Sequence, residues 1–406
     1  MVTIHKKKVL KRKVKSRHRA KSRSVEKSAE IAYYYGFTHA VPFKLKKEDF
    51  DIARKVLELK EENELEKHIF SIRPEEKVAL FRNFLKDNPS PLSQPLMLYY
   101  ERIDGGRVRA LPNEKRFYLD IIGTTKSIAE AVLIKTALEI LKDEGYENLQ
   151  IEINSIGDKD SMSSFMRDLS NYYRKNINTL SAHCRQALKD DPFDVLLCDN
   201  EKCQSQKGNA PHPIDSLSET ARKHFGEVLE YLETLKIPYK ISTDLLHSRK
   251  LCMGTIFSIK DTDTGTTLAV GLRYNSLSKK IGYKKELGAA GIFVHYKKGT
   301  GSVKKLKRKF KSAKIYFIQL GFEAKLKSLE IVEILRKEKI PLAQGLVKDK
   351  LAPQLEVAER LKVPYSIIMG QKEALEGSII VRDMATRCQE TIPIARLAEY
   401  LKKIKG

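Results

Sequence analysis

Cysteine and histidine side chains cluster in one stretch of the sequence and could together bind a metal ion. Cys198 and Cys203 are separated by four residues, and Cys184, His183 and His212 lie nearby. Thiolate and imidazole groups are the usual protein ligands of zinc. The four-residue gap is wide for a zinc motif, and the stretch lacks a second pair with CxxC spacing. The sequence therefore favours no metal site here, and zinc stays the less favoured alternative.

Lysine and arginine, which bind phosphates, are concentrated at two places in this 406-residue chain of formal net charge +24. Residues 1–24 hold eleven basic and no acidic side chains, and residues 297–311 hold eight basic and no acidic ones. A block of like charge cannot bury apolar surface, and its natural partner is a polyanion such as nucleic acid. We expect a disordered RNA-binding arm over residues 1–24, with a solubilising or targeting tail as the alternative. We also expect a basic RNA-binding linker over residues 297–312 that includes Lys304, Lys305, Lys307 and Arg308.

Nothing in the sequence predicts a membrane span or a secretion signal. No apolar run approaches the roughly 18 residues that cross a bilayer, and no apolar stretch follows the N-terminal charges. Five cysteines, an odd number in a long chain, fit a reducing compartment. We expect a cytoplasmic protein without a membrane partner.

A folded core must position the chemically active residues, and hydrophobic periodicity predicts it over residues 25–296. Residues 29–43 have the pattern of a helix that runs into a strand, and residues 128–141 have helical apolar spacing with Gly145 at the C-cap. Further elements are expected as a strand over 149–153, helices over 162–173 and 218–235, and paired strands over 255–260 and 267–271.

A second domain is expected over residues 313–406, because strands there alternate with helices of about ten residues. The pattern predicts a small, mostly parallel sheet covered by helices. Its strands are expected over 315–320, 365–369 and 378–381, and its helices over 326–335, 351–361 and 394–401.

Several sequence segments resemble the histidyl-tRNA synthetase family in both residue identity and spacing. The middle of that family's catalytic domain is similar to IEINSIGD at 151–158, to Cys184-Arg185 and to DPFDVLLCDNEKCQ at 191–204. Tyr35-Gly36-Phe37 with Pro42 resembles the strand before the first class II motif, Arg73-Pro74-Glu75 resembles an Arg-Pro-Glu segment, and residues 371–393 resemble the anticodon-binding domain. The resemblance covers nearly all of the chain from about residue 25.

The resemblance implies an α+β fold of the class II aminoacyl-tRNA synthetases. An antiparallel sheet with helices around it would form the core, and a small α/β anticodon-binding-like domain would follow. Family members are usually homodimers, and their active site lies on the open face of the antiparallel sheet. Because fold alone does not confer a reaction, the site residues decide the function.

Aminoacylation requires cations that neutralise the charge of ATP, supplied by arginines and Mg²⁺. Residues 99–111 resemble the family's second motif, whose loop glycine and two arginines are present as Gly106, Arg107 and Arg109. The arginine that the family places on the α-phosphate corresponds to Tyr99, which carries no charge. The two remaining arginines could contact a nucleotide or an RNA end, or could belong to a solvated loop.

Other substrate-binding positions of the family are changed or only partly kept. Arg116 and Asp120 stand where the family uses a glutamine and a glutamate. Glu75 matches a glutamate that accepts a hydrogen bond from the amino group of histidine, although a carboxylate at the start of a helix is an equally good interpretation.

The family's histidine-specific segment, with its arginine, aspartate and paired tyrosines, corresponds to residues 245–257. Its key positions are held by His247, Lys250, Leu251 and Cys252. The glycine-rich strand that follows survives in part at 271–277, including Arg273 and Tyr274. In the third motif, His295 stands close to the place of the arginine that stacks near adenine.

Two ATP-binding cations are therefore absent by this alignment. Removing one preorganised charge contact typically costs about 3 kcal/mol, or roughly two decades in rate. We assign no catalytic residue, and ATP and Mg²⁺ are expected as ligands only if ligase activity survives. The residual candidates for a ligand pocket are Arg73, Glu75, Arg107, Arg109, Asp120, Arg273 and Tyr274.

The segment that resembles the family's anticodon reader keeps polar side chains that could read splayed bases and hold phosphates. These residues are Gln371, Lys372, Glu373, Arg382 and Arg387. A solvated sheet edge is the alternative interpretation.

Three functions stay open on this evidence. The first is a protein with lost or weak aminoacylation that binds tRNA or another structured RNA. The second is an active, divergent histidine–tRNA ligase. The third is a regulatory subunit like that of ATP phosphoribosyltransferase, which typically lacks the anticodon-binding domain.

Overall fold

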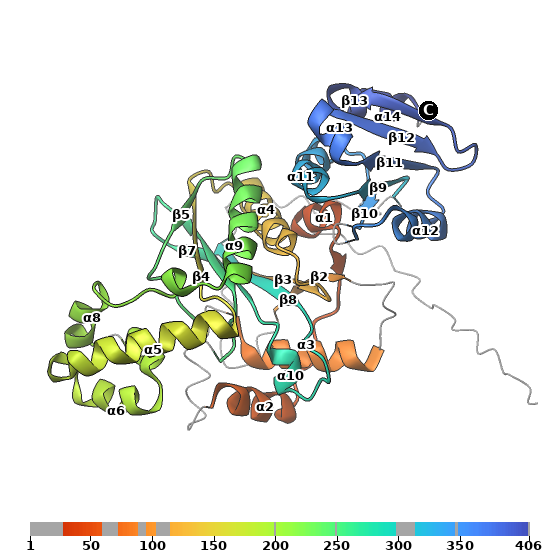
Figure 1. Ribbon diagram of the computed structural model, residues 1–406. Helices are drawn as coiled ribbons and strands as arrows, with labels where there is room; N and C mark the ends of the chain where they lie inside the picture. Colours follow the sequence, from red (N-terminus) through yellow and green to blue (C-terminus); the bar gives the residue numbers. More distant parts are fainter. Residues whose placement is uncertain are drawn as a thin grey trace, which may run out of the picture.

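The computed structural model describes residues 27–58, 72–87, 95–102, 114–198, 200–247, 250–297, 313–345 and 348–404. Both basic segments therefore lie outside the described residues, apart from Lys297 at the end of a strand, and their predicted roles stay predictions. Figure 1 shows two sheets, each with helices packed against it.

The larger sheet has eight strands in the order β1-β2-β3-β8-β7-β6-β4-β5. All neighbouring pairs are antiparallel except the two edge pairs, β1 with β2 and β4 with β5. The predicted antiparallel core is thus confirmed. The strands are β1 (Thr38–His39), β2 (Leu96–Glu101), β3 (Glu114–Ile122), β4 (Leu149–Ser155), β5 (Tyr239–Ile241), β6 (Thr255–Asp261), β7 (Thr267–Arg273) and β8 (Ala289–Lys297).

Helices cover both faces of this sheet. One face packs on α4 (Ile128–Asp143), α9 (Glu219–Thr234) and α1 (Lys27–Tyr34), whose apolar side chains share a single core with it. The opposite face packs on α2 (Lys47–Leu57) and α3 (Pro74–Asp87) through a separate core. Because side chains alternate along a strand, even-numbered residues of β3 face α3 and odd-numbered residues face α4.

A helical unit extends from one end of the large sheet (Figure 1). It consists of α5 (Lys159–Lys175), α6 (Ala182–Asp190), α7 (Pro192–Leu196) and α8 (Glu201–Lys207). Its buried side chains, among them Phe165, Leu169 and Phe193, form a small core of their own. A short loop with a 3-10 turn then leads back to α9.

The C-terminal domain contains a five-stranded sheet in the order β10-β9-β11-β12-β13. The pairs β10–β9 and β9–β11 are parallel, whereas β11–β12 and β12–β13 are antiparallel. The prediction of a mostly parallel sheet was wrong, because the predicted strand β12 runs antiparallel to β11, and a missed edge strand, β13 (Gln389–Pro393), runs antiparallel to β12. The other missed edge strand, β10 (Leu342–Gln344), is parallel to β9. The other elements are β9 (Ile315–Gln319), α11 (Phe322–Lys337), α12 (Leu351–Leu361), β11 (Tyr365–Met369), α13 (Gln371–Glu376), β12 (Ser378–Asp383) and α14 (Leu397–Lys403).

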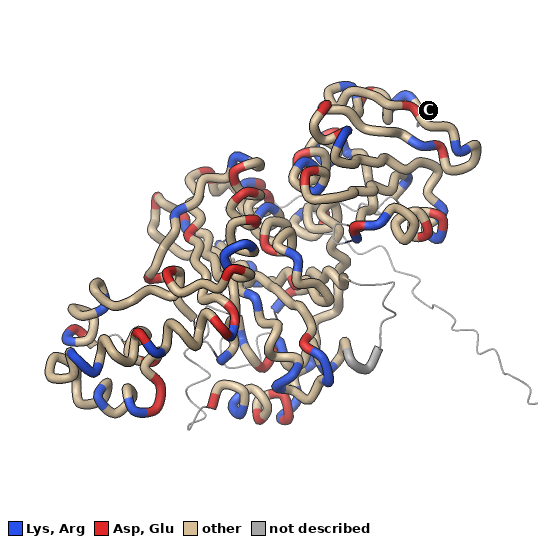
Figure 2. Tube along the Cα trace, in the orientation of Figure 1, with Lys and Arg blue, Asp and Glu red and all other residues tan. Residues whose placement is uncertain are grey.

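The two domains meet through α11. The Tyr35 hydroxyl donates a hydrogen bond to Glu333 at 2.8 Å, and the Arg336 guanidinium bonds both Glu333, at 2.7 Å, and Glu139 of α4, at 3.0 Å. Lys and Arg are interleaved with Asp and Glu over both domains in Figure 2. Most of the excess positive charge therefore belongs to residues 1–24 and 297–311.

Candidate functional site

A lysine and an aspartate form an ion pair buried between α3 and the large sheet. The Lys77 ammonium donates hydrogen bonds to both carboxylate oxygens of Asp120, at 2.8 and 2.7 Å. Both side chains have an exposed fraction of 0%. The hydroxyls of Tyr100 and Tyr274 also donate to Asp120, at 2.6 and 2.5 Å. The carboxylate is thereby held by one ammonium and two phenols, all buried.

Aromatic rings complete the walls around this ion pair. The Lys77 ammonium lies 3.9 Å from the ring centroid of Tyr118 and within 6 Å of the rings of Tyr100 and Tyr274. Burial raises the pKa of both Tyr100 and Tyr274 well above its ordinary value, so these phenols stay protonated donors. Burial lowers the pKa of Lys77, and the neighbouring Asp120 opposes this effect. The ion pair and the three tyrosine rings together occupy this part of the face of the sheet.

Two further carboxylates lie beside the pair, at the start of α3. Glu75 and Glu76 are 3% and 8% exposed. Arg73 approaches Glu75 at 3.8 Å and Glu76 at 3.9 Å, and the Arg102 guanidinium lies 3.3 Å from Glu76 and stacks over the ring of Phe293. Burial raises the pKa of Glu75. A hollow of about 270 Å³, which includes open solvent, adjoins Glu76, Tyr100 and Arg102.

The far end of β3 carries another charge cluster. The Arg116 guanidinium donates to Glu114 at 2.6 Å, and His295, its cross-strand neighbour, lies 3.5 Å from the same carboxylate. Burial alone would raise the pKa of Glu114, but Arg116 and His295 outweigh it and the pKa is lowered. Arg116 is thus engaged with a carboxylate of its own chain.

Tyr99, which the resemblance aligns with an α-phosphate arginine, faces away from Asp120. Tyr99 pairs with Leu119 in the sheet and faces α4, where its ring packs on Phe117 and its hydroxyl contacts Ser28 at 3.0 Å. Tyr99 therefore lies on the opposite face from Asp120. Tyr100, the next residue, lies on the same face as Asp120 and donates a hydrogen bond to it. The sequence alone did not show which side of the strand each tyrosine faces.

The histidine-specific segment contributes mainly apolar packing in its second half. Leu251 and Cys252 are 0% and 1% exposed and belong to the same core as Tyr100 and Tyr274. Burial raises the pKa of the Cys252 thiol to about 12. Both side chains are therefore closed to solvent.

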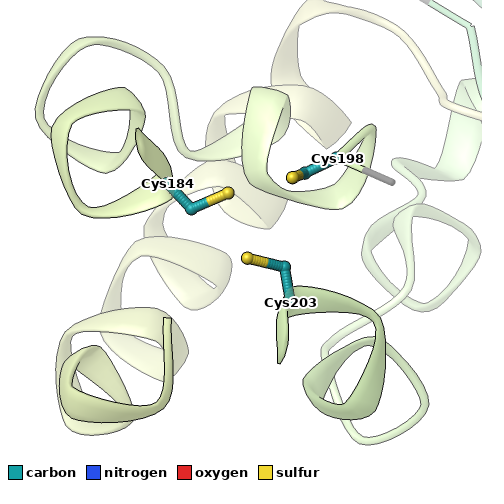
Figure 3. Close-up of side chains that lie close together, drawn as sticks. All are labelled: Cys184, Cys198 and Cys203. Carbon is teal, nitrogen blue, oxygen red and sulfur yellow. The ribbon is translucent and has the colours of Figure 1, made fainter. Parts of the chain in front are cut away.

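The cysteines considered as metal ligands are brought together in the helical unit. The sulfur atoms of Cys184, Cys198 and Cys203 all lie within 4.8 Å of one another (Figure 3). His183 and His212 do not join this group. Three of the five residues considered in the sequence therefore lie together.

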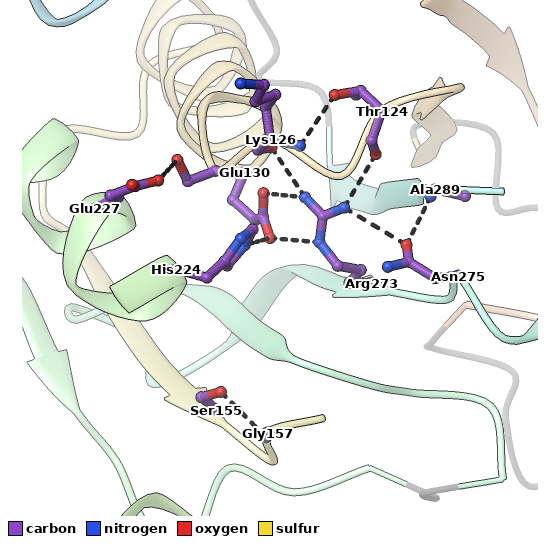
Figure 4. Close-up of polar contacts among 11 residues, drawn as sticks. Thr124, Lys126, Glu130, Ser155, Gly157, His224, Glu227, Arg273, Asn275 and Ala289 are labelled. Carbon is purple, nitrogen blue, oxygen red and sulfur yellow. Dashed lines mark hydrogen bonds and ion pairs between the residues drawn. The ribbon is translucent and has the colours of Figure 1, made fainter. Parts of the chain in front are cut away.

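Arg273 takes part in a second buried network, away from Asp120 (Figure 4). Its guanidinium bonds both oxygens of Glu130, at 2.8 and 2.5 Å, and the carbonyls of Thr124 and Lys126, both at 3.1 Å. His224 contacts Glu130 at 2.9 Å. Burial alone would raise the pKa of Glu130, but Arg273 and His224 outweigh this effect and lower the pKa to about 2. Arg273 thus ties β7 to the start of α4.

Only some of the residues predicted to line a ligand pocket lie together in the structure. Lys77, which the sequence analysis missed, joins Asp120 and Tyr274 in one cluster, and Arg73 and Glu75 lie close to it on α3. Arg107 and Arg109 lie outside the described residues. A signal for Lys77 was present: Lys77, Phe81 and Phe84 recur at helical spacing, which predicts a buried position.

The predicted RNA-binding residues of the C-terminal domain lie at two separate places. Gln371, Lys372 and Glu373 begin α13, where the Glu373 carboxylate accepts a hydrogen bond from the backbone amide of Gly370. Arg382 and Arg387 belong to the opposite end of the β12–β13 hairpin (Figure 1). The hairpin turn presents Arg387 to solvent with a φ of 63°. One ligand could touch both places only if it extended along the sheet.

Comparisons with known proteins agree with this architecture. Residues 314–404 match the anticodon binding domain family. The chain is 29% identical over 346 residues to a histidine–tRNA ligase of Halothermothrix orenii, covering 82% of each protein. It is 28% identical over 353 residues to a histidine–tRNA ligase of Listeria innocua, covering 82% of this chain and 81% of the relative.

The structure of apo histidyl-tRNA synthetase from S. aureus has a similar fold. The two align with a TM-score of 0.50 at 21% identity, over 91% of this chain and 92% of the other. Among the described residues, no helix is both long and apolar enough to cross a membrane.

Proposed function

Because the chain belongs to the histidyl-tRNA synthetase family, we propose that it is a member with lost or weak aminoacylation that binds tRNA or another structured RNA. One observation carries the loss of activity. The Lys77–Asp120 pair and the rings of Tyr100 and Tyr274 fill the face of the sheet on which the family binds histidine and ATP.

The space and charge that remain on this face are poorly suited to a nucleotide. The hollow beside Tyr100, which measures about 270 Å³ with open solvent included, is lined by two carboxylates, Glu76 and Glu101, and by one cation, Arg102. Among the described residues on this face, Arg102 pairs with Glu76 and Arg116 with Glu114. A triphosphate would have to displace these carboxylates before it could be neutralised.

Support for RNA binding comes from the C-terminal domain and the basic segments. Residues 314–404 match an anticodon binding domain, and Lys372 and Arg387 are exposed on it. Residues 1–24 and 297–311 add nineteen basic side chains without an acidic one. These cations would strengthen binding to phosphates without reading sequence.

Histidine-dependent pyrophosphate exchange and tRNA binding test this proposal together. We expect no exchange above background with the purified chain, and tRNA binding that weakens steeply with salt, because each phosphate contact releases counterions. Exchange at the speed of an ordinary synthetase would refute the loss of activity. A dissociation constant for tRNA that stays constant over a severalfold rise in salt would refute the RNA-binding proposal.

An active, divergent histidine–tRNA ligase is the second candidate. It is favoured by one feature: Arg102 and Arg116 lie on the same face as Asp120 and could supply positive charge that the family draws from other positions. ATP and Mg²⁺ would then be required. If exchange is detected, Arg102→Ala and Arg116→Ala should each abolish it.

The proposed cellular context follows from the family and the cysteines. All five cysteines are free thiols, which suits the cytoplasm, and family members are usually homodimers. A regulatory subunit like that of ATP phosphoribosyltransferase is the third candidate, but the C-terminal match to an anticodon binding domain argues against it. Co-purification of the chain with the transferase would support this third candidate.

A further inference from the structure

Three thiols converge inside the helical unit formed by α5 to α8. Cys184 belongs to α6, Cys203 belongs to α8, and Cys198 follows α7. Figure 3 shows their side chains pointing toward one another from these separate segments, and all three sulfur atoms lie within 4.8 Å of one another. Cys184 and Cys203 are 1% and 2% exposed, whereas Cys198 is partly open to solvent.

We infer that Cys184, Cys198 and Cys203 bind one zinc ion as thiolates. Zinc–sulfur bonds of about 2.3 Å place the sulfur atoms of a tetrahedral site roughly 3.8 Å apart. The observed separations therefore need to close by no more than about 1 Å, which side-chain rotation can supply. Zinc fits better than Ca²⁺ or Mg²⁺, since those ions prefer oxygen ligands.

Neighbouring polar groups suit a charged sulfur cluster. The backbone amide of Asn200 lies 3.4 Å from the Cys198 sulfur and donates a hydrogen bond to it, and the Ser181 hydroxyl lies 3.5 Å from the Cys203 sulfur. Zinc binds cysteine as the thiolate, so zinc binding would release protons from the thiols.

The coordination sphere also follows from the surroundings. Among the described residues, no fourth His, Cys, Asp or Glu joins the three sulfur atoms. Three protein ligands leave one zinc position for water, which can enter beside the partly open Cys198.

The helical unit has a physical need for such a cross-link. α6, α7 and α8 contain nine, five and seven residues, and helices this short are unstable alone in water. Their shared core is small, and small units commonly depend on a metal or a disulfide. One ion bound to all three segments would fix their relative positions.

Cobalt substitution tests the site in the full-length chain, kept reduced and first freed of metal with a chelator. We expect one Co²⁺ per chain with a thiolate-to-cobalt charge-transfer band, and displacement of cobalt by zinc. Cys184→Ser and Cys203→Ser should weaken cobalt binding at least about tenfold, since even losing an outer partner of a metal ligand costs that much. Cys252→Ser is the matched control, because Cys252 is equally buried but lies in a different core.

A second measurement avoids variants that fail to fold. Zinc should raise the thermal midpoint of the unaltered chain, whereas the same concentration of Mg²⁺ should not, because only zinc binds the folded thiols. Absence of the charge-transfer band from folded, reduced protein would overturn the inference. Equal loss of the band in Cys252→Ser and Cys203→Ser would also overturn it, because the cluster would then have no special role.

Discussion

Removing the ammonium of Lys77 should destabilise the protein far more than removing both charges of its ion pair. In Lys77→Met the Asp120 carboxylate stays buried, with only the hydroxyls of Tyr100 and Tyr274 to hold it. Breaking a buried ion pair by removing one partner typically costs about 3–5 kcal/mol. For a domain of this size, that cost corresponds to a fall in thermal midpoint of roughly 6–20 °C.

The double variant Lys77→Met/Asp120→Asn separates the cost of an unpaired buried charge from the cost of the changed packing. It removes the stranded charge and keeps the shape of the side chain, so it should be more stable than Lys77→Met alone. Thermal and urea unfolding, followed by two optical probes, would measure the free energies of unfolding of all variants. Lys372→Met on the exposed face of α13 is the control and should change stability by no more than about 0.5 kcal/mol.

Two results would contradict this account of the buried pair. Unfolding of Lys77→Met at the wild-type midpoint would mean that the ammonium is not enclosed with Asp120. Alternatively, the double variant could be less stable than the single one, in which case packing of the lysine stem, and not its charge, dominates.

Three other predictions concern separate parts of the molecule. The pKa of Glu130 in the folded chain, about 2, lies below its ordinary value of 4.5, so ionised Glu130 should contribute about 3 kcal/mol of stability above pH 4.5. This contribution should be lost as the pH falls toward 2. Glu130→Gln should remove this pH dependence from the free energy of unfolding measured in urea. Gly291→Ala should destabilise the chain by about 1–3 kcal/mol in the same assay, because an added Cβ would lie 2.0 Å from an Asp120 oxygen. Arg387→Ala should weaken tRNA binding and reduce its salt slope by about 1, as expected for one lost phosphate contact.

The architecture was largely predictable from the sequence because it depends on local periodicity and on long matching segments. The strand at Tyr365–Met369 was predicted to the residue, and the paired strands that became β6 and β7 were confirmed. The edge strand β10 was missed, since a strand of three residues has almost no periodic signal. The edge strand β13 was missed because four of its five residues are exposed and it shows no alternation of apolar and polar side chains.

The arrangement of the site was less predictable, because it depends on which face each side chain occupies. A shift of one residue moves a side chain to the other face of a sheet, and the sequence did not show that Tyr99 faces α4 whereas Tyr100 faces Asp120. The three cysteines show a different limit. Cys184 lies fourteen positions before Cys198, and only the packing of α6, α7 and α8 brings the sulfur atoms together.

The balance of charges on the face of the sheet that holds Asp120 bears on both parts of the proposed function, the loss of aminoacylation and the binding of RNA. An ATP-dependent ligase needs surplus positive charge where the triphosphate binds. Among the described residues on the face of Asp120, three cations are matched by carboxylates: Lys77 by Asp120, Arg102 by Glu76 and Arg116 by Glu114. Most of the surplus charge of the chain belongs instead to residues 1–24 and 297–311. Because phosphates bind where unmatched cations are available, polyanion binding would be directed to those segments and not to the ancestral pocket.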